Sequence, residues 1–241
     1  LANMNTDKQH CVISGTSRGL GRALAEHFLG LGYSVAGCSR GDATIDHPDY
    51  SHSVVDVRDE AEVQKWARDV RREATRVDVL ICNAGLARSA LFLPMTPGDV
   101  FEDFLGTNFA GVFYVLREFS KLMIRQGSGR ILTISSTMAA LHQEGTAVYS
   151  ATKSAVTEMT KVLARELAPQ NITCNIIAPA MMETDASAEL AKSEEWRDQM
   201  LALQTFPRII EMQEICHAAD FFVSDKAASI TGQVVYIGLV D

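Results

Sequence analysis

Residues 15–21 read Gly-Thr-Ser-Arg-Gly-Leu-Gly, and their surroundings decide the fold. The five residues before them, His-Cys-Val-Ile-Ser, form a short apolar run that suits a buried strand. In residues 22–29, which follow the loop, apolar side chains recur at helical spacing. A strand, a glycine-rich turn and a helix in this order indicate a dinucleotide-binding unit.

The three glycines of this loop have separate physical tasks. Gly15 allows a tight turn, Gly19 lets the backbone approach a pyrophosphate at the helix N-terminus, and Gly21 lets helix and strand pack closely. A phosphate-binding loop of the NTPase type ends in Gly-Lys-Ser/Thr, whereas this loop ends in Gly-Leu-Gly. The loop therefore favours a dinucleotide over a nucleoside triphosphate.

Beyond the loop, strand-like runs alternate with helix-like runs along the whole chain. We expect strands at residues 10–14, 33–38, 53–57, 77–82, 130–135, 172–178 and 233–237, and helices at 19–31, 60–74, 97–106, 109–125, 147–168 and 212–224. This alternation predicts a parallel sheet with right-handed crossovers and helices on both faces. The predicted fold class is α/β, a Rossmann-type, doubly wound, seven-stranded parallel sheet in a single domain spanning residues 1–241. The segment between Gly41 and His52 is short and polar, which leaves little room for a helix between the second and third strands.

Composition narrows the functional classes. The net charge of −8 argues against a nucleic-acid partner, and no apolar run is long enough to cross a bilayer. The five cysteines form no Cys-x-x-Cys pair and the six histidines form no metal-binding pattern, so we expect reduced thiols and no metal site. The polar N-terminus lacks the apolar region of a signal peptide, so we expect a cytoplasmic protein.

Tyr149 and Lys153 lie four residues apart in a helix-like segment and so share one face. A nearby cation favours the phenolate and lowers a phenol pKa from its usual value of about 10. Such a tyrosine suits the interconversion of a carbonyl and an alcohol, provided that another group carries the hydride. Taken alone, this pair is better explained by an ordinary amphipathic helix, because a tyrosine and a lysine at this spacing are common.

Four motifs in the same order resemble those of the short-chain dehydrogenase/reductase family over nearly the whole chain. They are the glycine spacing of residues 15–21, the sequence Asn83-Ala84-Gly85 after an apolar run, Asn108 in a helix, and Ser136 thirteen residues before Tyr149 and Lys153. The overall resemblance is greatest to 3-oxoacyl-carrier-protein reductases, whose ending is similar to residues 230–235, Ile-Thr-Gly-Gln-Val-Val.

The resemblance implies a role for each residue of a catalytic tetrad. Tyr149 would exchange the proton with the substrate oxygen, and Ser136 would donate a hydrogen bond to that oxygen. Lys153 would lower the Tyr149 pKa and hold the nicotinamide ribose, and Asn108 would hold a water that connects Lys153 to solvent. Ser135 competes with Ser136, but neighbouring side chains of a strand point to opposite faces and the spacing to Tyr149 favours Ser136.

The resemblance also implies a cofactor site. Its residues are Gly15, Ser17, Arg18, Gly19, Leu20, Gly21, Ser39, Arg40, Asp56, Val57, Asn83, Ala84, Gly85, Tyr149, Lys153, Pro179 and Thr184. Without the resemblance, Asp56 is equally well read as a solvated acid at a strand end.

The residues at the end of the second strand bear on the choice of cofactor. An acid there would bind the 2′-hydroxyl of NAD, whereas this strand ends in Cys38-Ser39-Arg40. Arg18 and Arg40 could bracket a 2′-phosphate, so we expect NADP(H), with NAD(H) as the alternative if Asp42 reaches the ribose.

The substrate is expected to be a small carbonyl compound, either free or thioester-linked, such as a 3-oxoacyl group. A specialised secondary-metabolite ketone reductase or alcohol dehydrogenase is the close alternative, and a catalytically idle cofactor-binding regulator is the third. Residues 182–205 resemble the mobile substrate lid of the family or form a simple surface helix, and Ala180 replaces the usual glycine before them. By resemblance, we expect a homotetramer or homodimer assembled through the helices at 109–125 and 147–168.

Overall fold

The computed structural model describes residues 8–87, 91–182 and 194–240. The strands are β1 (His10–Ser14), β2 (Ser34–Ser39), β3 (Tyr50–Val54), β4 (Val79–Cys82), β5 (Gly129–Ile134), β6 (Ile172–Pro179) and β7 (Val234–Ile237). The α-helices are α1 (Gly19–Gly30), α2 (Glu60–Glu73), α3 (Gly98–Phe104), α4 (Gly111–Gln126), α5 (Met138–Leu141), α6 (Ala147–Leu167), α8 (Glu194–Ala202) and α9 (Met212–Val223). Short 3-10 turns lie at Leu93–Met95, Ala168–Gln170 and Asp225–Ala227.

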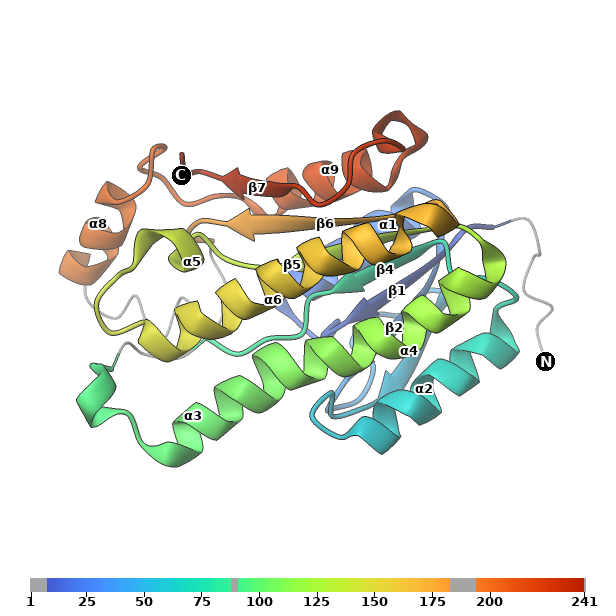
Figure 1. Cartoon of the computed structure of the whole chain (residues 1–241), viewed down its shortest axis with the longest axis horizontal. Helices are drawn as coiled ribbons and strands as arrows, with labels where there is room; N and C mark the ends of the chain where they lie inside the picture. The colour runs from blue at the N-terminus through green and yellow to red at the C-terminus, as the bar shows by residue number, and fades with distance from the viewer. Residues whose placement is uncertain (1–7, 88–90, 183–193, 241) are drawn as a thin grey trace.

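The seven strands form one sheet in the order β3-β2-β1-β4-β5-β6-β7, and every neighbouring pair is parallel. Helices α2, α4 and α6 cover one face of the sheet, and α1 and α9 cover the other (Figure 1). On the first face, Trp66 of α2 packs edge-on against Phe119 of α4, with ring centroids 4.8 Å apart. On the second face, Leu24 and Phe28 of α1 are fully buried. The predicted doubly wound parallel sheet in a single domain is confirmed.

The third strand begins three residues earlier than the apolar pattern predicted. Tyr50–Val54 pairs with β2, whereas the prediction placed the strand at residues 53–57. The pattern misled because Val55 and Val57 are buried in the core although they lie beyond the strand. Residues 40–49 contain no helix, as their length and polarity predicted.

Two predicted helices form one continuous rod, in which α3 and α4 are joined by a π-helical turn at Leu105–Ala110 (Figure 1). A π-turn inserts one residue into the helix and redirects the side chains around it. Asn108 lies in this turn and is fully buried, so the irregular turn places a polar side chain inside the fold.

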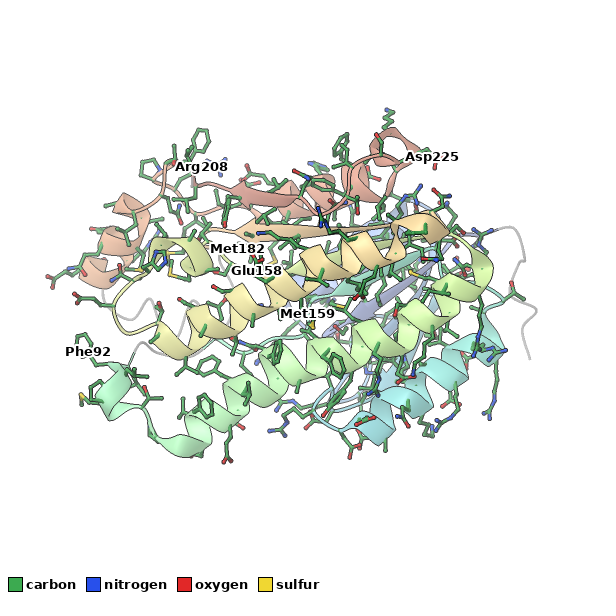
Figure 2. The ribbon with its side chains drawn as sticks, in the orientation of Figure 1. Phe92, Glu158, Met159, Met182, Arg208 and Asp225 are labelled. Atoms are coloured by element: carbon green, nitrogen blue, oxygen red, sulfur yellow. The ribbon has the colours of Figure 1, made fainter. Side chains whose placement is uncertain are left out.

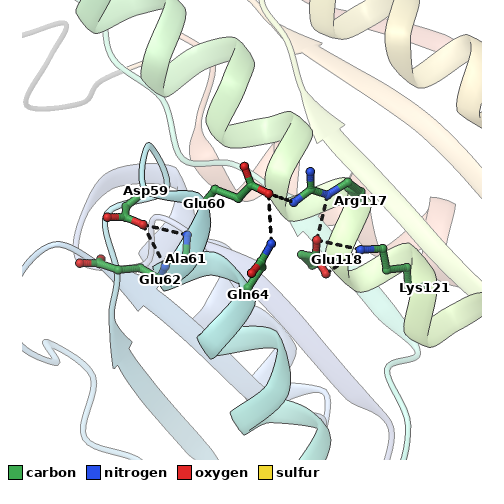
Figure 3. Close-up of polar contacts among 8 residues, drawn as sticks. All are labelled: Asp59, Glu60, Ala61, Glu62, Gln64, Arg117, Glu118 and Lys121. Carbon is green, nitrogen blue, oxygen red and sulfur yellow. Dashed lines mark hydrogen bonds and ion pairs between the residues drawn. The ribbon is translucent and has the colours of Figure 1, made fainter.

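Polar contacts connect the start of α2 with the middle of α4 (Figure 3). Asp59 caps α2 by accepting hydrogen bonds from the backbone N–H groups of Ala61 and Glu62. From α4, Arg117 reaches Glu60 at 2.6 Å, and its guanidinium lies over the Phe113 ring. Exposed ion pairs contribute only about 0–1 kcal/mol each, so these contacts add little to the stability of the fold.

No helix in the described part of the chain is long and apolar enough to cross a membrane.

Candidate active site

A cavity of about 290 Å³ runs along the carboxyl ends of the central strands. Fifteen of the seventeen residues predicted to bind the cofactor line it. They are Gly15, Ser17, Arg18, Gly19, Leu20, Gly21, Ser39, Arg40, Asp56, Val57, Asn83, Ala84, Gly85, Tyr149 and Lys153. The lining also includes residues that the sequence did not assign to the cofactor, namely Cys38, Val55, Leu86, Ala87, Thr107, Ile134, Ser135 and Met182. Ligand sites in open α/β sheets lie in this position, outside the carboxyl ends of the strands.

The backbone around the glycine loop is packed so tightly that no side chain fits at Gly15 or Gly21. A Cβ on Gly21 would lie 2.0 Å from the carbonyl oxygen of Gly15 and 2.3 Å from Nδ2 of Asn83. Gly15 has a φ of +81° and Gly19 a φ of +55°, values that favour glycine. The loop therefore keeps bare backbone at the N-terminus of α1, as a cradle for a pyrophosphate requires.

Ser14, at the end of β1, ties this loop to the loop after β4. Its hydroxyl oxygen accepts hydrogen bonds from the backbone N–H groups of Asn83 and Ala84, both at 3.1 Å. The Asn83 side chain returns two bonds, to the carbonyl oxygens of Ser14 at 3.0 Å and Gly15 at 3.1 Å. Sequence reasoning missed Ser14, because nothing in a strand-end serine reveals which distant backbone it will contact.

Tyr149 and Ser136 face each other at the nicotinamide end expected from the resemblance. The two side chains share a hydrogen bond, which offsets part of the rise that burial causes in the Tyr149 pKa. Ser135 points instead into the α6 side of the core, where its hydroxyl bonds to Thr157 at 2.8 Å and to the Lys153 carbonyl oxygen at 3.2 Å. The two serines therefore do point in different directions, and Ser136 is the one beside the phenol. Ser136 and Asn108 are not among the residues that line the cavity.

The direction of the Tyr149 pKa shift differs from the prediction. Burial outweighs the Ser136 hydrogen bond and raises the pKa, and Lys153 contributes no lowering. The reason is distance and hydrogen bonding, since the Lys153 ammonium lies 5.9 Å from the Tyr149 ring centre and donates to the carbonyl oxygen of Ile134 at 2.9 Å. Burial also lowers the pKa of Lys153 to about 8.

Asn108 fixes the loop that crosses above Lys153. Its Oδ1 accepts from the Leu86 backbone N–H at 2.7 Å, and its Nδ2 donates to the Leu86 carbonyl oxygen at 3.0 Å. The loop passes close to both groups, because a Cβ on Gly85, the residue before Leu86, would lie in ordinary van der Waals contact with them, 3.4 Å from the Lys153 amine and 3.5 Å from Oδ1 of Asn108. In this structure Asn108 therefore positions backbone beside the lysine.

At the opposite end of the cavity the lining is basic. Arg18 from the glycine loop and Arg40 after β2 both line it, whereas Asp42 is exposed and does not. Asp56 also lines this end, and Arg58 holds it in place through contacts of 2.6–3.1 Å. Hydrogen bonds from Arg58 hold the Asp56 pKa below its usual value, and the charge of Arg40 adds to this effect.

Several residues of the predicted site lie elsewhere. Pro179 is buried at the end of β6 and does not line the cavity, and Thr184 lies outside the described residues. The Ala180 methyl packs on Gly238 inside the core and is not part of the lining, so it does not crowd the cavity. Of the predicted lid, the described part contains α8, and Met182 (labelled in Figure 2) lines the cavity. No cluster of three or more His, Cys, Asp or Glu side chains suited to a metal occurs among the described residues.

Comparisons with known proteins agree with this arrangement. A family model described as enoyl-(acyl carrier protein) reductase matches residues 15–238. The 3-oxoacyl-[acyl-carrier-protein] reductase FabG of Salmonella typhimurium is 32% identical over 240 residues, which cover 97% of each chain. A crystal structure of an actinorhodin polyketide ketoreductase variant with NADPH superposes with a TM-score of 0.88 at 27% identity over 97% of both chains. The structure of ElxO with NADP bound gives 0.89 at 26% identity, over 95% of this chain and 97% of that one.

The family match extends from the glycine loop to the residue after β7, and the relatives are matched along almost their whole length. The chain therefore belongs to the short-chain dehydrogenase/reductase family, as an oxidoreductase that acts on a carbonyl or CH–OH group with a nicotinamide cofactor.

Proposed function

We propose that this protein is an NADPH-dependent reductase that converts a 3-oxoacyl thioester, or a closely related ketone, into the secondary alcohol. The observation that carries the proposal is the layout of one cavity. Tyr149 and Lys153 of α6 line it beside the carboxyl ends of β4 and β5, and Arg18 and Arg40 line it beside the carboxyl ends of β1 and β2, together with the glycine cradle.

The residues of the cavity suit NADP(H). The bare backbone of the glycine loop would hold the pyrophosphate, since side chains at Gly15 and Gly21 are sterically excluded. Arg18 and Arg40 would neutralise a 2′-phosphate, and the exposed Asp42 is outside the cavity and would not repel it. Of the relatives named above, the two solved structures carry NADPH or NADP.

The protein's own groups would manage the substrate oxygen and its proton. The bound nicotinamide supplies the hydride. Ser136 donates a hydrogen bond toward the carbonyl oxygen, where negative charge grows during reduction, and Tyr149 delivers the proton to it. The Tyr149 phenol is protonated at neutral pH, because burial raises its pKa above the usual value of about 10, and this suits a proton donor. The pKa of Lys153, about 8, is close to neutral pH, so its ammonium can pass a proton toward the phenol afterwards.

The thioester assignment is supported by the curated relative, which reduces a 3-oxoacyl group carried by an acyl carrier protein. The described wall of the site is apolar near Leu86, Ile134 and Met182, which suits an acyl chain.

One observation favours a free ketone as the second candidate. In the carrier-protein reductases that this chain resembles, basic residues near the assembly helices attract the acidic carrier, and Arg125 and Arg130 are the two candidates in this sequence. Of these, Arg130 lies at the start of β5. Its side chain is only 14% exposed, donates to the carbonyl oxygens of Gly129 and Asn171, and lies 3.8 Å from Asp225 (labelled in Figure 2). A guanidinium held in this way is a weak docking point for an acidic partner.

The test is to follow NADPH oxidation by its absorbance with a 3-oxoacyl thioester and with matched free ketones. We expect thioester turnover in the wild type and a loss of at least about a hundredfold in Tyr149→Phe, because general acid catalysis contributes about that much or more. Tyr114→Phe is the matched control, since Tyr114 lies on α4 outside the cavity. Turnover of free ketones alone would select the second candidate. Tight NADPH binding with no turnover of any ketone would contradict both and favour the regulator.

A further inference from the structure

We propose that Tyr50 and His52, on the edge strand β3, are specificity-determining positioning residues for the 2′-phosphate end of the cofactor. Neither lines the cavity, and neither was singled out by the sequence. The inference rests on the proposed NADPH preference and deepens it. It concerns how a chain without a helix between β2 and β3 holds the turn that carries Arg40.

The two side chains form a hydrogen-bonded chain from the glycine loop to that turn. The Thr16 hydroxyl lies 2.8 Å from the Tyr50 hydroxyl, which lies 2.8 Å from Nδ1 of His52. Nε2 of His52 then lies 2.9 Å from the carbonyl oxygen of Gly41 and 3.2 Å from the Ser39 hydroxyl. The chain thus joins Thr16, next to Gly15, with the residues on both sides of Arg40.

Chemistry assigns the direction of these bonds. A carbonyl oxygen only accepts, so Nε2 of His52 carries the proton that it donates to Gly41. In the neutral imidazole Nδ1 must then accept, and the Tyr50 hydroxyl donates to it. The Tyr50 oxygen then accepts from the Thr16 hydroxyl, whose single proton goes to Tyr50 at 2.8 Å in preference to the Cys38 carbonyl oxygen at 3.4 Å. With these directions each donor of the network has an acceptor, which is what a network that fixes a conformation requires.

Two donors converge on one carbonyl oxygen in the turn. His52 reaches the Gly41 oxygen at 2.9 Å, and the Ser39 hydroxyl reaches it at 3.0 Å. Ser39 is buried, whereas Arg40 and Gly41 are exposed. Hydrogen bonds thus fix the backbone on either side of Arg40, while the Arg40 side chain lines the cavity. A guanidinium on a held turn gives up less conformational freedom when it binds a phosphate.

The sheet is shaped to admit this network. In the register of β2 and β3, His52 is opposite Gly37. A Cβ on Gly37 would lie 2.3 Å from the Tyr50 hydroxyl and 2.5 Å from the Thr16 hydroxyl, so only glycine leaves room for the link. Tyr50 and His52 alternate with Ser51 and therefore share one face of the strand. Three separate positions, Gly37, Tyr50 and His52, thus serve one contact chain.

The test compares the affinities of NADPH and NADH by calorimetric titration of the wild type, Tyr50→Phe and His52→Ala. We expect the dissociation constant of NADPH to rise about fivefold to tenfold in each variant, as the loss of one or two hydrogen bonds implies, while that of NADH changes less than about twofold. His47→Ala is the matched control, because His47 lies in the same connection and accepts a hydrogen bond from the Asp49 backbone instead. His52→Gln, which restores a side-chain N–H donor, should recover part of the NADPH affinity.

The ratio of the two affinities is the readout that a merely structural role would not move. Retained NADH binding shows that the variants are folded. A wild type that prefers NADPH, with an unchanged ratio in both variants, overturns this inference and leaves the proposed function standing. Equal weakening of NADPH and NADH also overturns it, since the network would then support the fold and not the 2′-phosphate. A wild type that binds NADH as tightly as NADPH overturns the proposed cofactor preference, and this inference with it.

Discussion

Replacing Lys153 by methionine should make the cofactor-free protein more stable at neutral pH while removing its activity. Lys153 is 5% exposed and donates a hydrogen bond to the carbonyl oxygen of Ile134. Its pKa falls from 10.5 to about 8 because burial disfavours the charged form. Below pH 8 the folded protein therefore carries a buried ammonium that the unfolded chain exposes to water. Methionine has a similar length and no charge, so it removes this cost.

The structure sets the size of the effect. The gap between a pKa of 10.5 and one of about 8 corresponds to about 3 kcal/mol of unfolding free energy. The lost hydrogen bond to Ile134 offsets about 1 kcal/mol of that gain. Lys153→Met should therefore be more stable than the wild type by about 2 kcal/mol at pH 7.

The pKa shift of Lys153 also fixes the direction in which stability changes with pH. Between pH 8 and pH 10.5 the unfolded lysine still binds its proton and the folded one does not, so wild-type stability rises with pH through this window. The advantage of Lys153→Met should shrink above pH 8 and vanish near about pH 10. Burial also raises the pKa of the thiols of Cys38 and Cys174 to about 12, which lowers stability above pH 9 in both proteins equally and cancels in the difference.

The assay is urea unfolding of both proteins from pH 6.5 to 10, followed by circular dichroism at one protomer concentration, because assembly shifts apparent stability. NADPH oxidation measured on the same preparations reports the loss of activity. A Lys153→Met protein less stable than the wild type at pH 7, or a stability difference that does not change between pH 7 and 10, would refute the reasoning.

Three further predictions follow from named contacts. Gly21→Ala should abolish cofactor binding and lower the unfolding midpoint, since its Cβ would lie 2.0 Å from a backbone carbonyl oxygen. Gly30→Ala, at the end of the same helix, is the control, because its Cβ would meet nothing within 4 Å and should leave both properties unchanged. Cofactor titration and thermal melts of the two variants test this prediction. Ala180→Gly should cost about 1 kcal/mol of stability by denaturant unfolding and leave kcat/KM unchanged, because the methyl packs in the core, and a kinetic change would show that it bears on the site. Phe113 and Val162 are 40% and 56% exposed on the two helices expected to mediate assembly. The double variant Phe113→Glu with Val162→Glu should therefore convert a tetramer into smaller species, as measured by analytical ultracentrifugation. A monomeric wild type would contradict the expected assembly.

Local sequence patterns predicted the sheet and the cofactor cradle well. The glycine spacing of residues 15–21 is a local rule, because a tight turn and close backbone packing act within a few residues. The alternation of strands and helices sufficed to predict that the strands are parallel, because right-handed crossovers leave few topologies. The pattern was less reliable at β3, because the buried Val55 and Val57, on which the prediction of this strand rested, lie beyond its end.

Other features depend on contacts between distant parts of the chain. The helical pattern broke between residues 106 and 109, but this break did not reveal a π-turn that buries Asn108, and the partner of that residue, Leu86, lies in a distant loop. The pair of Tyr149 and Lys153 was visible at its spacing, but the direction of the Tyr149 pKa shift depended on burial by the surrounding elements.

By itself the sequence determined the fold class and the glycine cradle, because these follow from short-range spacing, and its resemblance to a known family selected the four candidate residues of the tetrad. The tertiary structure decided the electrostatics of that tetrad, the π-turn and the chain from Thr16 through Tyr50 and His52 to Gly41. The physical reason is that desolvation and hydrogen bonding depend on which groups the folded sheet brings together, and residues 16, 41 and 52 become neighbours only when β1, β2 and β3 are paired.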